Sequence, residues 1–345
     1  MSQSINSYQS FCIIRLSSIG DITHMIPVIR TLQDNNPKSD ITWIIGKTEY
    51  SLVKNMKNIE FIIIDKRKFW STLLTMISIR RKRVFGVLLH MQVSFRSNLI
   101  SLFVNSRRKI GFNHYYSKNL HSLFVDEVIQ APERIHVLDV FFYFLEALGI
   151  KRRSLNWDIN IDCKKMQKPL DERYVVINPF TSSRFFNYRE WDLNNYAKII
   201  DYLHKKYNVK TILVGGDNDN EIVQSVLLAS NCKDVLNLVG KTSLKELYNI
   251  LYHSELYIGP DSGTLHIASM VHKPIIGLFS SSNPDRTGPY NNREYIINKY
   301  DEALLKYNNK VSTQVKWGKR VRKKNVMLLI QSEDVLEKID KILNF

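Results

Sequence analysis

Short apolar segments alternate with helix-length amphipathic segments along most of this chain of 345 residues. In the first half, strands are predicted at 12–16, 41–45, 61–64 and 84–89, and helices at 22–33, 50–56, 69–79, 95–104 and 135–148. In the second half, strands are predicted at 174–178, 211–214, 235–238, 256–258 and 274–279, and helices at 193–206, 220–229, 244–253 and 264–270. This alternation is typical of parallel sheets covered by helices.

A polar stretch over 160–172 separates the two halves and has the composition of a linker. We therefore predict an α/β protein with two Rossmann-like domains facing a cleft, in which ligands bind at the carboxyl ends of the strands. The domains are expected at 1–165 and 172–330. The remaining residues, 331–345, are expected to form a C-terminal helix that packs back on the first domain.

The apolar runs are far shorter than the roughly 20 residues that span a bilayer. The first ten residues lack the basic start and apolar middle of a signal peptide, so a cytoplasmic location is expected. The three cysteines, Cys12, Cys163 and Cys232, lie far apart without metal-ligand spacing. We expect them to be buried thiols.

The net charge of +16 is unevenly distributed. Between Glu60 and Ile110, eleven basic residues face two acidic ones. These basic residues are Lys66, Arg67, Lys68, Arg80, Arg81, Lys82, Arg83, Arg96, Arg107, Arg108 and Lys109. Such a cluster favours an anionic partner, which could be a nucleic acid, an acidic membrane surface or a phosphorylated substrate. Nucleic acid is the least favoured, because no aromatic side chains are interleaved with the cluster to stack on bases.

The segment 257–266 predicts an anion site, because an apolar strand runs through a turn directly into a helix. Gly263 allows close approach of a ligand, and the N–H groups of the first helical turn point at it. Asp261 and His266 flank this turn. The Asp261 carboxylate would hold sugar hydroxyls or orient the imidazole; the alternative is an Asx-type turn that caps the helix.

A second site is predicted at 16–24, where two serines and Gly20 follow the first strand and Asp21 opens a helix. Asp21 is either a helix N-cap or a carboxylate directed at the cleft. A third segment, 177–191, contains hydroxyls and arginines suited to a diphosphate. The Asp-x-Asp pattern at 217–219 is interpreted as helix capping rather than a metal site, and Glu221 as a ribose ligand.

Together these motifs resemble the ADP-heptose:lipopolysaccharide heptosyltransferases, inverting enzymes of the GT-B architecture, over nearly the whole chain. The resemblance is carried by Ser18-Ile19-Gly20-Asp21 with His24 and Pro27, by Asp261-Ser262-Gly263-Thr264-Leu265-His266, and by Thr287-Gly288-Pro289-Tyr290. The chain departs from the family in three places. Arg189 stands where Lys is common, Phe180 where Gly is common, and Ser281, Ser282 and Asn283 where Gly-Pro-Thr is common.

The resemblance implies that the first domain binds the acceptor and the second the nucleotide-sugar. In a single displacement at the anomeric carbon, a base removes the acceptor proton while a diphosphate leaves, and Asp21 is expected to be that base. The implied donor-binding residues are Ser182, Ser183, Arg189, Glu221, Asp261, Ser262, Gly263, Thr264, Leu265 and His266. The expected acceptor-binding residues are Ser18, Gly20, His24, Arg80, Arg81, Lys82 and Arg83.

No metal or other cofactor is expected, because Arg189 and the helix N-terminus can stabilise the leaving diphosphate. The expected partners are an ADP-sugar and an anionic glycolipid acceptor, with peripheral contact to the inner face of the inner membrane and no nucleic acid. Two alternatives remain at this point. One is a related GT-B transferase with another nucleotide-sugar or a protein acceptor, and the other is a sugar-nucleotide epimerase.

Overall fold

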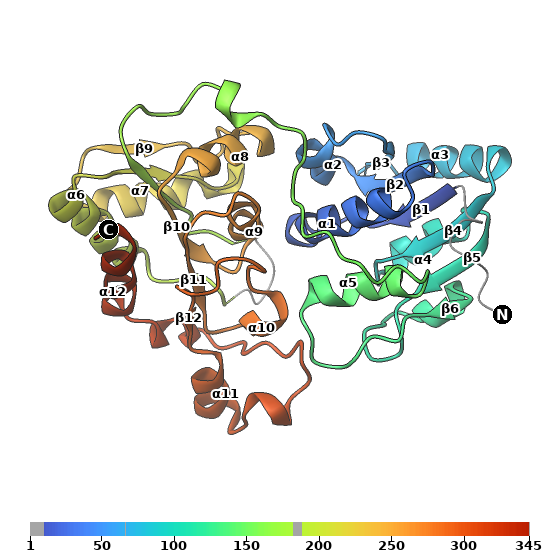
Figure 1. The fold of residues 1–345 in the computed structure, drawn as a ribbon. Coiled ribbons are helices and arrows are strands. Elements are labelled where there is room, and N and C mark those ends of the chain that lie inside the picture. The colour runs from blue at the N-terminus through green and yellow to red at the C-terminus, as the bar shows by residue number, and fades with distance from the viewer. Residues whose placement is uncertain (1–9, 66, 182–187, 345) are drawn as a thin grey trace. The chain divides into compact units, whose positions relative to one another are not determined.

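The computed structural model describes residues 10–65, 67–181 and 188–344, and it divides into two compact units, Met1–Ile161 and Asp162–Phe345 (Figure 1). Each unit contains one six-stranded sheet whose neighbouring strands all run parallel. The predicted α/β class with two Rossmann-like units is therefore confirmed.

In the first unit the strand order is β3-β2-β1-β4-β5-β6. The strands are β1 (Ser10–Ile14), β2 (Asp40–Gly46), β3 (Glu60–Ile64), β4 (Phe85–His90), β5 (Ser106–Gly111) and β6 (Glu127–Val128). The order reverses between β1 and β4, and the carboxyl ends at such a switch point are where ligands bind in open α/β sheets. Sequence patterns did not indicate β5, because its Arg-Arg-Lys run has the composition of a charged loop.

The helices of the first unit are α1 (Ile19–Asn35), α2 (Lys47–Val53), α3 (Phe69–Lys82), α4 (Phe95–Ser101) and α5 (Val137–Glu146), with a 3-10 turn η2 (His121–Phe124). Helix α1 begins three residues earlier than predicted, because Ser18 occupies the N-cap position. Asp21 lies at the third helical position, where it accepts a hydrogen bond from the Ser18 N–H at 3.1 Å. The expectation that Asp21 opens the helix is therefore wrong.

In the second unit the strand order is β12-β11-β10-β7-β8-β9. The strands are β7 (Tyr174–Ile177), β8 (Lys210–Leu213), β9 (Val235–Asn237), β10 (Leu256–Pro260), β11 (Ile275–Phe279) and β12 (Ile297–Asn298). The helices are α6 (Leu193–Tyr207), α7 (Asn220–Ala229), α8 (Leu244–His253), α9 (Gly263–Met270), α10 (Pro284–Thr287), α11 (Tyr300–Asn308) and α12 (Ser332–Leu343). Short 3-10 turns lie at η3 (Cys163–Lys165), η4 (Asp217–Asp219), η5 (Ser312–Gln314) and η6 (Val326–Leu329).

Helix α12 packs against α6 within the second unit. Val335 and Ile339, one turn apart, are fully buried in the core of this unit. Asp340 accepts hydrogen bonds from Tyr202 at 2.8 Å and Tyr207 at 2.6 Å, both on α6. The expectation that 331–345 packs back on the first domain is therefore wrong, because the apolar face of α12 is covered by its own unit.

The three cysteines are buried and unpaired, as predicted. Across residues 10–65, 67–181 and 188–344, no helix is both long and apolar enough to cross a membrane.

Candidate active site

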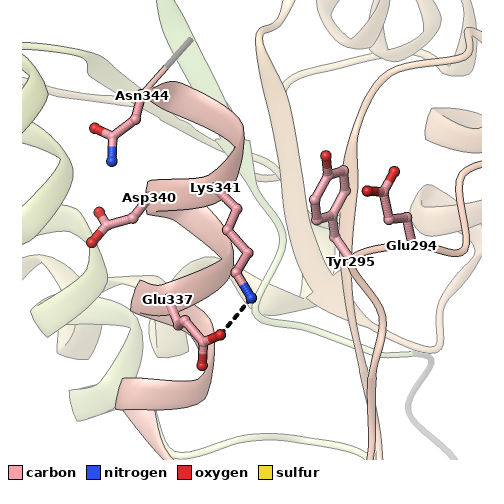
Figure 2. A pocket seen from close by; sticks show the side chains of 6 residues that line it. All are labelled: Glu294, Tyr295, Glu337, Asp340, Lys341 and Asn344. Carbon is pink, nitrogen blue, oxygen red and sulfur yellow. Dashed lines mark hydrogen bonds and ion pairs between the residues drawn. The ribbon is translucent and has the colours of Figure 1, made fainter.

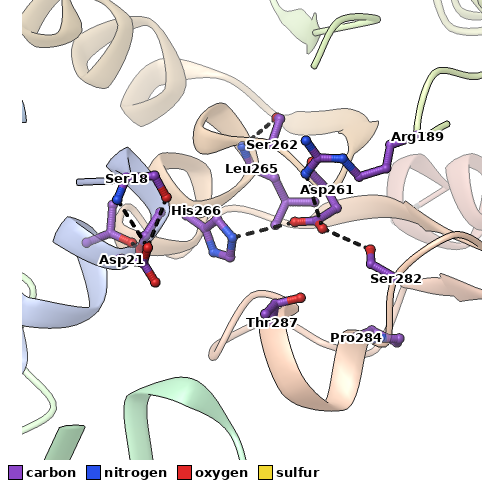
Figure 3. Close-up of polar contacts among 12 residues, drawn as sticks. Ser18, Asp21, Arg189, Asp261, Ser262, Leu265, His266, Ser282, Pro284 and Thr287 are labelled. Atoms are coloured by element: carbon purple, nitrogen blue, oxygen red, sulfur yellow. Dashed lines mark hydrogen bonds and ion pairs between the residues drawn. The ribbon is translucent and has the colours of Figure 1, made fainter. Parts of the chain in front are cut away.

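The Asp21 carboxylate lies at the carboxyl end of β1 and uses only one of its two oxygens for contacts with the described residues. Asp21 Oδ2 accepts from the Ser18 N–H at 3.1 Å and from the Ser18 hydroxyl at 3.0 Å (Figure 3). The same oxygen pairs with Arg15 Nη2 at 2.5 Å. Among those residues Oδ1 has no partner. The Asp21 side chain remains 29% exposed, so the carboxylate is not closed off from a ligand.

Arg15 dominates the electrostatics of this carboxylate. Burial raises the pKa of Asp21, but the Arg15 charge and the hydrogen bonds from Ser18 outweigh that effect, and the pKa lies below its ordinary value. The Asp21 side chain is therefore ionised at neutral pH, with one oxygen restrained.

Arg15 was not indicated by the sequence, where it is one cation at the end of an apolar strand. Its guanidinium is nearly buried, donates to the Met91 carbonyl at 2.5 Å and stacks on the Phe141 ring at 5.0 Å from the centroid. Gln92, from the loop after β4, accepts from the Leu16 N–H at 2.5 Å. The β1 and β4 loops together thus build the setting of Asp21.

The predicted acceptor-binding residues are placed in different ways. Ser18 is exposed beside Asp21, whereas Gly20 is buried in the first turn of α1. His24 is only 4% exposed and lies edge-on to His136 with ring centroids 5.2 Å apart, which favours packing over a direct ligand contact.

In the basic run at the end of α3, part of the charge is used internally. Arg83 pairs with Glu60, and Arg80 donates to the Leu102 carbonyl at 3.2 Å. Arg81 is exposed. Lys82 ends α3, and its side chain lies outside the described residues.

In the second unit, Asp261 forms the centre of a buried polar cluster at the carboxyl end of β10. Its Oδ2 accepts from Ser282 at 2.8 Å and lies 3.4 Å from Arg189 Nη1, which also donates to the Asp261 carbonyl at 2.7 Å (Figure 3). His266 Nε2 lies 3.9 Å from Asp261 Oδ1. Asp261 and Arg189 are only 5% and 8% exposed. The Asp261 carboxylate therefore serves to hold the Arg189 guanidinium in place, whether or not it also binds a ligand.

Ser262 is the N-cap of α9, and its hydroxyl accepts from the Leu265 N–H at 3.5 Å. The same hydroxyl contacts Asn178 at 3.3 Å. The capping residue is thus Ser262 rather than Asp261, and the Leu265 N–H is engaged. Gly263 and Thr264 are the first two residues of α9, where N–H groups have no acceptor within the helix and lie at the positive end of its dipole, an arrangement suited to an anion.

Three predicted donor residues are placed less fully. Ser182 and Ser183 lie outside the described residues. Glu221 is in the first turn of α7, and its side chain lies outside the described residues. Asp219 occupies the N-cap position of α7 but makes no side-chain capping hydrogen bond, and its carboxylate accepts instead from the Gly216 N–H at 2.8 Å. In the part of the chain that the structure describes, no three His, Cys, Asp or Glu side chains gather where they could hold a metal ion.

A hollow of about 540 Å³ in the second unit lies away from these residues (Figure 2). It is lined by α12 and the segment before β12, where Lys341 pairs with Glu337 at 2.6 Å. None of the predicted site residues lines it.

The chain is similar to a known family of proteins over most of its length. The family model described as glycosyltransferase family 9 (heptosyltransferase) matches residues 77–334. The lipopolysaccharide core heptosyltransferase OpsX of Haemophilus influenzae is 33% identical over 341 residues, covering 97% of each chain.

The chain belongs to glycosyltransferase family 9. The family 9 fold extends over its whole length: a family 9 glycosyl transferase from Veillonella parvula superposes with a TM-score of 0.78 at 20% identity, covering 100% of this chain and 99% of that one. The Escherichia coli heptosyltransferase WaaC with ADP gives a TM-score of 0.76 at 16% identity, covering 96% and 99%. The protein is accordingly a glycosyltransferase, and the resemblance to heptosyltransferases seen in its motifs is confirmed.

Proposed function

We propose that this glycosyltransferase moves a heptose from ADP-heptose to the inner core of lipopolysaccharide with inversion, using Asp21 as the general base. The relatives support the sugar and the acceptor, since OpsX is named for lipopolysaccharide core heptosyl transfer and a solved structure of the heptosyltransferase WaaC is described with ADP. The observation that carries the mechanism is the asymmetry of Asp21. Three donors engage Oδ2, and none of the described residues engages Oδ1.

In the proposed reaction, an acceptor hydroxyl donates a hydrogen bond to Asp21 Oδ1 and attacks the anomeric carbon from the face opposite the diphosphate. The new bond joins the acceptor oxygen to that carbon, the bond from the carbon to the phosphate oxygen breaks, and ADP leaves. The acceptor proton passes to Oδ1. Arg15 lowers the basicity of Asp21 but keeps it ionised, which suits a proton transfer that follows oxygen–carbon bond formation.

The donor is proposed to bind the second unit. The Gly263 and Thr264 N–H groups at the start of α9 would receive the diphosphate. Arg189, held by Asp261, would add a fixed positive charge, and Ser182 and Ser183 are proposed as further donors. Leu265 is fully buried, so its proposed part is to hold the start of α9 in place. Glu221 is proposed to contact the ribose. His266 would lie near the phosphates. These groups would supply the stabilisation that other transferases obtain from a metal.

The test is transfer by the purified chain to a heptose-deficient core glycolipid, with ADP-heptose compared against other ADP-sugars and UDP-sugars. We expect ADP release and product only with ADP-heptose, and NMR of the product should show the anomeric configuration opposite to the donor. Preference for a different nucleotide-sugar would replace the donor assignment. This outcome has a structural basis, because Ser282, which departs from the family pattern, contacts Asp261 directly. Retention of configuration would refute the single displacement.

A further inference from the structure

Helix α4 of the first unit exposes an apolar face. Phe95 is 65% exposed, Leu99 40% and Leu102 46%. The spacing of four and then three residues places these side chains along one side of the helix. The opposite side carries Ser97 and Ser101, which are buried. The buried side also carries Ile100, which packs in the core of the unit, so α4 has apolar side chains on both its buried and its exposed sides.

The 3-10 turn η2 adds two more exposed leucines beside α4. The turn is attached to the helix because Asn98 donates to the Asn119 carbonyl at 2.8 Å, and the His121 Nδ1 lies 3.3 Å from the Asn98 side-chain oxygen. Burial lowers the pKa of His121 to about 4, so the ring is neutral and can make this contact at physiological pH. Leu120 is 71% exposed and Leu123 73%. We call Phe95, Leu99, Leu102, Leu120 and Leu123 the apolar patch.

The backbone at Leu120 has an unfavourable conformation that holds part of the apolar patch at the surface. Leu120 has a φ of 57° and follows Asn119 at 54°. Asn tolerates this left-handed conformation, but a bulky residue such as Leu is unfavourable there. An apolar side chain held outward by an unfavourable backbone is a feature that clusters at functional surfaces.

Three basic residues lie close to members of the apolar patch. Arg80 reaches the end of α4 through its hydrogen bond to the Leu102 carbonyl, and Arg96 and Lys118 are exposed next to Phe95 and Asn119 in the chain. The acidic Glu127, which follows η2, is paired with Arg108 at 2.7 Å. Apolar side chains with neighbouring cations complement an anionic lipid surface, in which the leucines enter the acyl boundary and the cations meet the headgroups.

The apolar patch begins at the same edge of the sheet as Asp21. Phe95 lies three residues after Gln92, whose side chain contacts the Leu16 and Ser17 N–H groups in the loop that leads to Asp21. We propose that the apolar patch docks the first unit on the anionic surface of a lipid bilayer. A lipid-anchored acceptor would then present its sugars to Asp21 while its acyl chains stay in the membrane. This role in presenting the acceptor rests on the proposed function, whereas docking on the bilayer does not.

The test is sedimentation of the full chain with vesicles of phosphatidylethanolamine and phosphatidylglycerol, compared with vesicles of phosphatidylcholine alone. The patch variant combines Leu120→Asn, which suits the left-handed backbone, with Leu123→Ser. We expect the wild-type chain to bind the anionic vesicles preferentially. The variant should bind them with an affinity at least about tenfold lower. The matched control is Leu228→Ser on α7 of the second unit, a leucine that is 83% exposed, and it should stay within about twofold of wild type.

Equal binding of the patch variant and the wild-type chain would overturn the proposal. The proposal would also fail if the wild-type chain formed a dimer that does not bind vesicles while the patch variant was a monomer. The patch would then be covered by a second copy of the chain. Transfer to a delipidated, soluble acceptor separates this proposal from the proposed function. The patch variant should keep that activity, whereas the absence of transfer in a wild-type chain that still binds vesicles would refute only the function.

Discussion

Replacement of Asp21 by Asn tests the proposed base with little change in shape. The amide oxygen can take the place of Oδ2 and still accept from Ser18 and Arg15. The amide NH₂ then occupies the place of Oδ1, where it cannot accept a proton. General base catalysis contributes about 10²–10⁴-fold, and a tenfold change corresponds to about 1.4 kcal/mol, so the barrier should rise by about 3–5 kcal/mol.

The cost in folding should be much smaller than the cost in rate. Arg15 is 10% exposed and Asp21 29%, so their pair lies between an exposed ion pair and a buried one, and weakening it should cost about 1–2 kcal/mol of unfolding free energy. The assay is kcat from ADP release at saturating donor and acceptor, with ADP affinity measured separately by calorimetry. We expect kcat to fall by at least about 100-fold with ADP affinity unchanged.

The control for Asp21→Asn is Ser18→Ala, which keeps the carboxylate and the backbone hydrogen bond but removes the hydroxyl. Its kcat should stay within about tenfold of wild type, since one of the three donors to Oδ2 is lost. If the folded Asp21→Asn protein also stays within about tenfold, Asp21 is a helix-capping residue and the base lies elsewhere.

Three further predictions concern the cation beside Asp21, the packing of β10 and the need for a metal. Arg15→Met removes the cation that lowers the pKa of Asp21 and leaves burial, which raises it; because transfer needs the ionised carboxylate, the acid limb of the pH profile of kcat should move to higher pH, and less so in Arg15→Lys. An unmoved limb would show that it does not report Asp21. Gly259→Ala places a Cβ against the Tyr257 hydroxyl and 2.7 Å from the Asn178 carbonyl oxygen, and should cost about 1–3 kcal/mol in urea unfolding. Gly216→Ala, whose Cβ meets only Asp219 Oδ2 at 3.6 Å, should be nearly neutral, and equal losses would contradict the steric argument. Transfer should survive dialysis against EDTA, whereas loss of activity restored by Mg²⁺ would show that a metal takes part.

Local patterns in the sequence predicted most of the fold because each strand and helix has its own hydrophobic period and its own capping residues. The predicted bounds of α7 and α8 coincide with the structure, and Ser243 and Glu246 form the capping box that begins α8. Strand β5 escaped prediction because its charged residues lie on a strand that is defined by pairing with β4 and not by apolar alternation.

The sequence by itself determined the two-unit α/β architecture and the order of the motifs, including Asp21 and the turn into α9. It could not assign Arg15, which meets the Met91 carbonyl 76 residues away only because β4 lies next to β1 in the sheet. The contact of Ser282 with Asp261 likewise depends on β10 lying beside β11. Ion pairs and hydrogen bonds between distant residues follow from strand order, which local periodicity does not encode. The tertiary structure alone therefore decided which oxygen of Asp21 is restrained, what holds Asp261, and that α12 completes the second unit.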